Sequence, residues 1–237
     1  MTAKGRLLLL RHGATEWAVL GRHTGSTDVP LTPEGELQAR AAARVLARVL
    51  GERTGGGAGG SGGAGGGVGS VEPALVVVSP RQRARRTAQL AGLGVPVASG
   101  GLGGGEPVVD QDLAEWDYGA YEGLTTPQIR ALRGDDWRAF RDGMAPGGPG
   151  QPPGEQLEQV AARCARVLGR VRPELERGDV VLVAHGHVLR ILATVWLGVD
   201  PTFGAQLLLD TAAVCVLGSE HEVPGLSRWN LSPGLLG

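Results

Sequence analysis

The sequence has few cysteines, no long apolar run and no excess of charge of one sign. Its two cysteines, Cys164 and Cys215, have no clustered partners, so they do not supply the ligands of a structural zinc site. We expect both to be small buried core residues rather than a disulfide. No run of about 18 apolar residues marks a membrane span. A formal net charge of -1 argues against a nucleic-acid partner held by a basic face.

The first residues, Met1 to Arg6, lead directly into a short apolar run rather than into a signal-peptide core. We therefore expect a soluble cytoplasmic protein that has no membrane partner. Composition leaves the oligomeric state open, with a homo-oligomer as one option.

The length and the pattern of apolar runs predict one α/β domain. A chain of 237 residues, 42% of them hydrophobic, can form one sizeable core, so we expect a single domain over residues 1–237. Strand-like and helix-like segments alternate, which predicts a three-layer α/β/α sandwich with a mostly parallel central sheet. The expected strands are 7–10, 74–78, 107–109, 180–184 and 212–217, and the expected helices are 33–50, 80–88, 137–142, 155–175 and 188–197. Thr32 and Ser79 are the expected caps of the first two helices.

Three segments outside these elements have a loop composition. Residues 54–70 are almost all Gly, Ala and Ser, which predicts a flexible surface loop without a catalytic role. A phosphate-cradling loop is excluded because no Gly-Lys-Ser/Thr ending follows. The Pro/Gly-rich segment 143–154 is a candidate lid. We expect the tail after about residue 221 to be irregular.

Two buried strands each end in a histidine and a glycine. Leu7 to Leu10 are followed by Arg11-His12-Gly13, and Val180 to Ala184 are followed by His185-Gly186-His187. Ligands of open α/β sheets bind outside the carboxyl ends of the strands, so these side chains should face a crevice. One such histidine is more often structural, but two in one domain indicate a site.

Further polar residues follow at other segment ends. Four arginines lie between Arg81 and Arg86, and Arg83 among them should occupy the first turn of a helix, where an anion is favoured. The segment Asp112 to Gly123 mixes carboxylates with aromatic rings and has no clean helical or strand period. Such a mixture is typical of the wall of a site that transfers protons, and Glu115 is its best candidate for proton donor.

Together these residue types indicate phosphate chemistry. Two guanidiniums match the oxygens of a phosphate, and a neutral His12 between them can attack phosphorus to give a phosphohistidine. Arg11, Arg83 and His185 would then stabilise the charge on the transferring group. The alternative of a metal-dependent hydrolase using His12, His185 and His187 is weaker, because His185 and His187 should alternate along an extended backbone and point to opposite sides.

Four ordered motifs across about residues 5 to 217 resemble the histidine phosphatase superfamily, in its phosphoglycerate mutase-like branch. The motifs are Leu10-Arg11-His12-Gly13, Ser79-Pro80 with Arg83-Ala84 and Thr87-Ala88, Leu113-Ala114-Glu115 with Gly119 and Glu122-Gly123, and Ala184-His185-Gly186. The resemblance implies a phosphoglycerate mutase-like fold and phosphorylation of His12. It also implies Glu115 as proton donor and a phosphate pocket of Arg11, Arg83 and His185, with no metal or other cofactor.

Longer stretches are similar to the subgroup of sedoheptulose-1,7-bisphosphatases and actinobacterial acid phosphatases. They include Gly21-Arg22-His23-Thr24-Gly25, Glu115 to Gly123 and Ala184 to Arg190. This resemblance implies hydrolysis of small phosphorylated metabolites, such as sugar phosphates or bisphosphates. The implied substrate-binding residues are Arg11, Arg22, Thr24, Gly25, Ser79, Arg83, Tyr118, His185, Gly186 and Arg190, of which Ser79, Tyr118 and Arg190 would contact the sugar or a second phosphate.

The sequence also departs from the mutases of this family. Ala14 and Ala18 stand where mutases usually have Glu and Asn, and the missing Asn removes a phosphate donor. A phosphoglycerate mutase remains the alternative enzyme, and a non-catalytic module that binds a phosphorylated ligand is the alternative outside catalysis.

Overall fold

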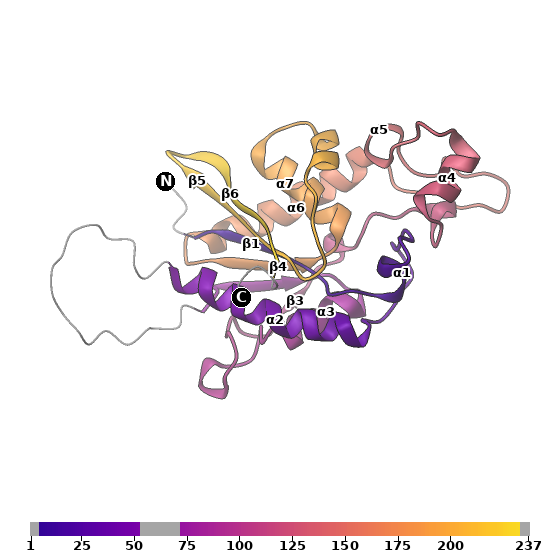
Figure 1. Cartoon of the computed structure of the whole chain (residues 1–237). Coiled ribbons are helices and arrows are strands. Elements are labelled where there is room, and N and C mark those ends of the chain that lie inside the picture. The colour runs from indigo at the N-terminus through magenta and orange to yellow at the C-terminus, as the bar shows by residue number, and fades with distance from the viewer. Residues whose placement is uncertain (1–4, 53–71, 233–237) are drawn as a thin grey trace, which may run out of the picture.

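A six-stranded sheet forms the centre of the molecule (Figure 1). The computed structural model describes residues 5–52 and 72–232. The strands lie in the order β3-β2-β4-β1-β5-β6. Strands β1 to β4 pair in parallel, whereas β5 runs antiparallel to β1 and β6 antiparallel to β5. Their bounds are β1 Leu7–Arg11, β2 Leu75–Val78, β3 Val108–Val109, β4 Val180–Ala184, β5 Val214–Glu220 and β6 Val223–Leu231.

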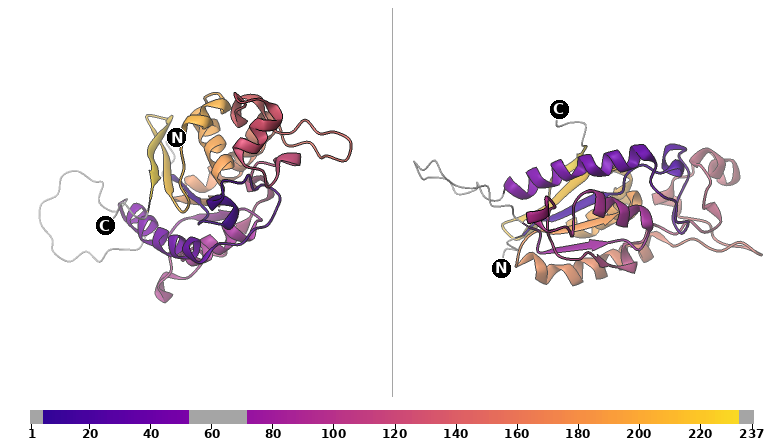
Figure 2. Two further views of the ribbon diagram at one scale, coloured as in Figure 1. Left: turned by 45° about the vertical axis from the view of Figure 1, so that its right-hand side comes forward. Right: turned by 90° about the horizontal axis from the view of Figure 1, so that it is seen from below.

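Helices cover both faces of this sheet, which confirms the predicted three-layer α/β/α fold (Figure 2). Helices α2 (Pro33–Gly51) and α3 (Gln82–Leu90) pack on one face, and α6 (Leu157–Leu175) and α7 (Gly186–Leu197) pack on the other. Because side chains alternate along a strand, the leucine run of β1 serves both layers. Leu8 and Leu10 join the α2 side of the core, and Leu7 and Leu9 join the α6 side.

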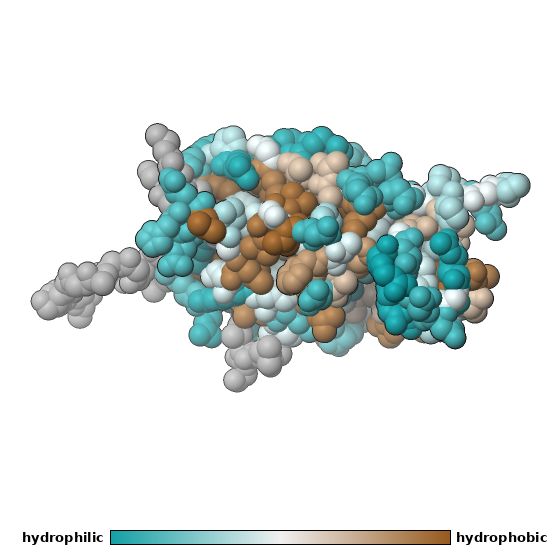
Figure 3. Space-filling model, turned by 90° about the horizontal axis from the view of Figure 1, so that it is seen from above, coloured by the Kyte–Doolittle hydropathy of each residue, from teal (hydrophilic) through white to brown (hydrophobic). Residues whose placement is uncertain are grey.

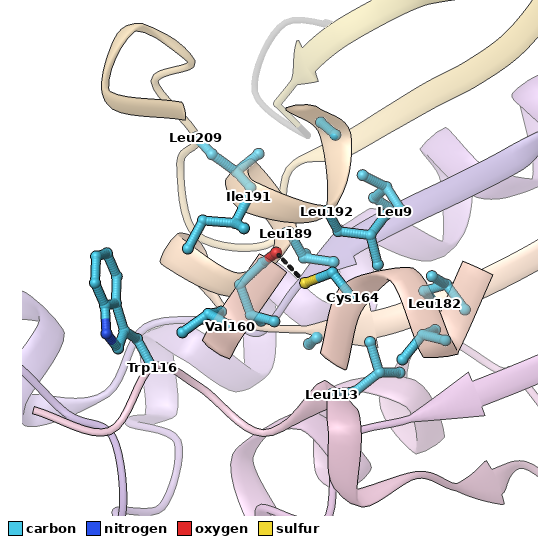
Figure 4. Close-up of a cluster of buried hydrophobic side chains, with 14 of the residues drawn as sticks. Leu9, Leu113, Trp116, Val160, Cys164, Leu182, Leu189, Ile191, Leu192 and Leu209 are labelled. Carbon is cyan, nitrogen blue, oxygen red and sulfur yellow. Dashed lines mark hydrogen bonds between the residues drawn. The ribbon is translucent and has the colours of Figure 1, made fainter. Parts of the chain in front are cut away.

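The α6 side of the core is drawn in Figure 4. Leu9 and Leu182 of the sheet face the side chains of α6 and α7, and Cys164 of α6 donates its Sγ–H to the carbonyl of Val188 at 3.7 Å. Cys164 and Cys215 are both buried and free, as expected. Burial raises the pKa of each thiol to about 12, so both stay protonated near neutral pH.

Smaller helices gather beyond the carboxyl ends of the parallel strands (Figure 1). They are α1 (Glu16–Val19), α4 (Thr126–Arg133) and α5 (Ala139–Asp142). Separate 3₁₀ turns along the described chain are Val97–Ser99, Gln111–Leu113, Gly119–Tyr121 and Pro201–Gln206. Helix α4 has a complete capping box between Thr125 and Gln128. None of the helices predicted from the sequence covers these residues. The segment 143–154 contains a turn closed by two backbone hydrogen bonds between Gly148 and Gln151.

Of the two expected helix caps, one is present and one is wrong. Thr32 caps α2 and accepts from the backbone N–H of Gly35. Helix α3 begins at Gln82 with no side-chain cap of its own, and Asp28 accepts from the N–H of Gln82 instead. Ser79 lies too far upstream for this role, and its hydroxyl is held by His185.

The expectation of an irregular tail after residue 221 is also wrong, because Val223–Leu231 forms strand β6 at one edge of the sheet. Pro224 and Gly225 disguised the strand pattern, but an edge strand tolerates them because only one of its sides needs ladder hydrogen bonds. The glycine-rich segment 54–70 lies outside the described residues. The parts of the chain that are described contain no helix of the length and apolarity that a membrane crossing needs.

The face of the molecule seen in Figure 3 has apolar side chains near its middle. Large apolar residues that are exposed in the C-terminal third of the chain are Val199, Phe203, Leu208, Val223 and Leu226. Apolar patches of this kind occur at protein–protein interfaces. The homo-oligomer stays a prediction.

Candidate active site

The turn after β1 is fixed by close backbone packing. A Cβ at Gly13 would lie 2.2 Å from the carbonyl oxygen of Gly35, and a Cβ at Gly35 would lie 2.0 Å from the carbonyl oxygen of Ala14. The N–H of Gly13 also donates to Thr87 Oγ1 of α3. Only glycine fits at these two contacts. The start of α2 therefore holds the backbone that carries His12.

His12 is held as a neutral imidazole with a defined tautomer. Its Nδ1 lies 2.7 Å from the carbonyl oxygen of Gly13 and must donate to it, so Nε2 keeps its lone pair. Burial, and then the charges of Arg11 and Arg83, lower the pKa of His12 well below 6.5. The ring is thus unprotonated at neutral pH, with a lone pair that can act as a nucleophile.

Arg11 brings a buried cation with an unused donor. Its Nη1 donates to the carbonyl of Leu209, and its guanidinium lies over Gly186, where an added Cβ would be 3.4 Å from Cζ. Its Nε has no hydrogen-bond partner and is one of two such buried side-chain nitrogens in the described part of the chain. An unpaired buried donor is costly unless a ligand accepts from it. Arg11 is therefore prepared for an anion.

Arg83, His185 and Ser79 form a buried chain of hydrogen bonds behind His12. Arg83 Nε donates to His185 Nδ1 at 3.1 Å, so His185 Nε2 carries the hydrogen and donates to Ser79 Oγ at 2.6 Å. The ring centroids of His12 and His185 are 5.1 Å apart. Burial, and then the charge of Arg83, lower the pKa of His185 well below 6.5, so it too is neutral. Both of its ring nitrogens are engaged, and it orients Arg83.

Glu115 lies at the N-terminus of helix α7, which begins next to His185. Its Oε1 accepts from the N–H groups of Trp116 and Val188, and its Oε2 accepts from the N–H of His187 at 3.0 Å. The residue is 8% exposed and lines the cavity. Oε1 accepts two hydrogen bonds and Oε2 accepts only one. Oε2 is therefore the oxygen that can exchange a proton with a bound group.

Neutral rings make up a further part of the cavity wall. The Tyr118 hydroxyl lies 2.7 Å from His187 Nδ1, and burial raises the pKa of Tyr118 well above 10. Burial also lowers the pKa of His187 well below 6.5 and that of His23 to about 4. The neutral tyrosine therefore donates to the neutral His187, and His187 Nε2 keeps a hydrogen to donate.

Further contacts arrange the rim of the cavity. His23 Nε2 lies 3.3 Å from Thr126 Oγ1, and its ring packs against Tyr118. The carboxylate of Glu122 accepts from the N–H groups of Gly25 and Thr27, which orders this loop. Arg190 donates to two carbonyls, those of Gly204 and Ala205, and stacks on the Phe140 ring at 4.7 Å.

A cavity of about 200 Å³ joins these groups. Eight of the twelve predicted site residues line it: Arg11, His12, Arg22, Thr24, Glu115, Tyr118, Gly186 and Arg190. Gly25 lies beside it, and Ser79, Arg83 and His185 lie behind it with no exposed surface. The lining residues that we did not predict are Thr15, Ala18, Gly21, His23, Thr126, His187 and Leu209.

Gly21, His23 and His187 were missed although the sequence held a signal, because they stand inside the stretches Gly21 to Gly25 and Ala184 to Arg190 that carried the finer resemblance. His187 was considered only as a metal ligand, on the expectation of an extended backbone. It instead lies in the first turn of α7, so that expectation is wrong. Within residues 5–52 and 72–232, no three His, Cys, Asp or Glu side chains are grouped as a metal ion requires.

Comparisons with known proteins show which family this chain belongs to. The acid phosphatase of Mycobacterium tuberculosis is 36% identical over 227 residues, which cover 96% of this chain and 93% of that protein. The sedoheptulose 1,7-bisphosphatase of Saccharomyces cerevisiae is 35% identical over 200 residues, covering 81% of this chain and 68% of that protein. A solved structure from Mycobacterium tuberculosis matches with a TM-score of 0.77 and 35% identity, over 97% of this chain and 98% of that one. The model of the histidine phosphatase superfamily, branch 1, matches residues 7–53 and 64–232, and the chain belongs to that family.

Proposed function

We propose that this protein hydrolyses phosphomonoesters of small sugar-like metabolites through a phosphohistidine at His12. The observation that carries the proposal is the neutral ring of His12, with the lone pair of Nε2 unused, beside two arginines whose hydrogen bonds go to carbonyl oxygens and an imidazole rather than to carboxylates. Such cations keep their charge for a ligand, and phosphate is the anion that their forks match.

The reaction divides into two displacements at phosphorus. His12 Nε2 forms a bond to phosphorus while the bond to the ester oxygen breaks, and Glu115 Oε2 gives its proton to the departing alkoxide. Water then attacks the phosphohistidine, Glu115 takes a proton from it, and the phosphorus–nitrogen bond breaks. Neutral His12 is thereby restored. Arg11 and Arg83 hold the charge of the transferring group throughout.

The neutral wall supports a polyol as the leaving group. Tyr118, His187 and His23 offer hydrogen-bonding groups without charge, which suits hydroxyl groups of a sugar. The relative named as sedoheptulose 1,7-bisphosphatase supports the same class of substrate, and the relative named as acid phosphatase supports hydrolysis. In Arg190, Nε and one hydrogen of Nη2 are used, so the rest of its guanidinium remains for a second phosphate.

Hydrolysis is favoured over internal phosphate transfer by the residue at position 18. Ala18 lines the cavity and offers no donor where the mutases usually place an asparagine. A mutase has to keep its phosphorylated histidine away from water while the intermediate reorients. A wall lacking that donor holds the intermediate less firmly, which favours attack by water.

A phosphate-release screen over sugar phosphates, sugar bisphosphates and phosphoglycerates tests this function, with the His12→Ala protein as control. We expect free phosphate from sugar phosphates and none with the variant. Formation of an isomerised phosphoglycerate without free phosphate would instead identify a mutase. Binding of sugar phosphates with no product of either kind would identify a non-catalytic module.

A further inference from the structure

A buried arginine of helix α6 lies next to the segment that carries Glu115. The side chain of Arg163 is only 7% exposed, although α6 faces the core mainly with apolar residues. Its Nη1 donates to the backbone carbonyls of Asp112 and Ala114, at 2.7 and 2.6 Å. It therefore holds the backbone immediately before Glu115 on a rigid helix.

The same guanidinium is joined to Glu155 through two further hydrogen bonds. Arg163 Nε and Nη2 donate to the two oxygens of this carboxylate at 2.9 and 3.0 Å. Glu155 in turn holds the backbone after Glu115. Its Oε2 accepts from the N–H of Asp117, and its carbonyl accepts from the indole N–H of the buried Trp116. Arg163 and Glu155 thus form hydrogen bonds to the chain on both sides of Glu115.

We propose that the Arg163–Glu155 pair positions Glu115 for proton transfer to the departing alkoxide, an inference that rests on the proposed function. The carboxylate of Glu115 must meet the N–H groups of His187 and Val188 on one side and the leaving oxygen on the other. Displacements of about 1 Å weaken such transfers strongly. The pair touches neither the substrate cavity nor His12, so Arg163 is a positioning residue.

Two other arginines on α6 provide a matched control. Arg166 and Arg170 lie further along the helix, are about half exposed, and bind the carboxylates of Asp112 and Asp110 rather than any backbone carbonyl near Glu115. Exposed pairs of this kind contribute little to stability. Arg166→Met therefore removes one arginine and its ion pair with the Asp112 side chain, but it leaves every hydrogen bond of Arg163 and Glu155 to the segment around Glu115 in place.

The test is the dependence of kcat/KM on the leaving group. Because kcat/KM covers only the steps up to release of the alcohol, it reports the proton given by Glu115 and is independent of the later attack by water. An alkyl phosphate needs that proton, whereas p-nitrophenyl phosphate leaves as a stable anion and does not. We expect Arg163→Met to lower kcat/KM by about 10-fold to 100-fold for an alkyl phosphate and by less than about 3-fold for p-nitrophenyl phosphate.

A series of aryl phosphates with graded leaving-group pKa gives the slope of this dependence. Arg163→Met and Glu115→Gln should both give a steeper slope. Arg163→Lys should bring the slope part of the way back to that of the unmodified protein, and Arg166→Met should leave it unchanged. If Arg163→Met does not fold, Glu155→Gln, which preserves shape and removes the charge, takes its place. An unchanged slope in the folded variant, whatever the overall loss, overturns the inference. An unmodified protein that releases no phosphate would overturn the proposed function instead.

Discussion

Strand β1 has an arginine at each end, and the two arginines have different hydrogen-bond partners. Arg6 precedes the strand and forms a bidentate pair with the buried Asp179, with Nη2 2.6 Å from Oδ2. Arg11 ends the strand and has a carbonyl partner and an unpaired Nε. A cation compensated by a hydrogen-bonded carboxylate holds the fold together. A buried cation with no hydrogen-bonded carboxylate, which we call uncompensated, is available to a ligand and costs stability until one binds.

Removing His12, the proposed nucleophile, should have the largest effect, and this effect should fall on activity alone. We expect His12→Asn to lower kcat by on the order of 10⁴-fold or more, because no other described group takes over bond formation to phosphorus. Phosphate release and labelling of the protein by substrate phosphate measure this. The urea midpoint should stay close to that of the unmodified protein, and a labelled His12→Asn protein would contradict the assignment.

Loss of the uncompensated cation should separate activity from stability. Arg11→Met should lower kcat/KM by about 10²-fold to 10³-fold, the range for one preorganised donor to a transition-state oxyanion. The free energy of unfolding should be unchanged or higher, since a buried unpaired donor is removed. Urea unfolding of the ligand-free protein checks the second part. A clear destabilisation would mean that Arg11 is structural.

Loss of the compensated cation, Arg6, should lower stability and leave activity unchanged. Arg6→Met leaves the carboxylate of Asp179 without its guanidinium partner, and breaking a buried pair of this kind costs about 3 kcal/mol of unfolding free energy. The value of kcat for the folded protein should stay within about 2-fold, because the pair lies at the opposite end of the strand from the site. Comparing Arg6→Met with Arg11→Met in the same two assays makes each the control of the other.

The electrostatic contrast also predicts a pH profile. The pKa of His12 is lowered well below 6.5, so the imidazole stays neutral as the pH falls through 6.5. Protonation would remove the nucleophile, and the acid limb of kcat/KM should therefore lie well below pH 6.5. Arg11→Met removes one of the two cations that lower this pKa, so its limb should move to higher pH. A limb at 6.5 in both proteins would contradict the placement of His12.

The smallest expected effect concerns selectivity at the rim. Arg190→Ala should weaken turnover of a sugar bisphosphate by about 10-fold more than hydrolysis of p-nitrophenyl phosphate, because only the bisphosphate has a second anion for this cation. Paired kcat/KM values from one protein preparation give the ratio. An equal loss on both substrates would remove Arg190 from the substrate-binding residues.

The main features of the fold and the site follow from strand patterns. Buried runs ending in Arg11-His12 and in His185 predicted neighbours, because parallel strands end at the same edge, and β1 and β4 are indeed paired with Arg11 beside Ala184. Edge strand β6 and helix α4 were not predicted. Pro224 and Gly225 masked the strand, and the short helix is set by its capping box rather than by a long apolar period.

Hydrogen bonds between side chains and groups far apart in the chain could not be predicted from the sequence. Ser79 was interpreted as a helix cap, but its hydroxyl binds His185, 106 residues away. Arg163 occupies a position on α6 that the periodic pattern assigns to no function, and its role depends on carbonyls of another segment. Such contacts depend on tertiary geometry that spacing along the chain does not encode.

The contact between Gly13 and Gly35 restricts how this enzyme can change. Neither position has space for even a methyl group, so the turn that carries His12 and the first turn of α2 form one rigid unit. Substitutions there would displace His12, the proposed nucleophile. Under the proposed function, a shift in substrate preference, whether natural or engineered, therefore has to come from the part of the cavity wall formed by His23, Tyr118 and Arg190, which stand on separate segments.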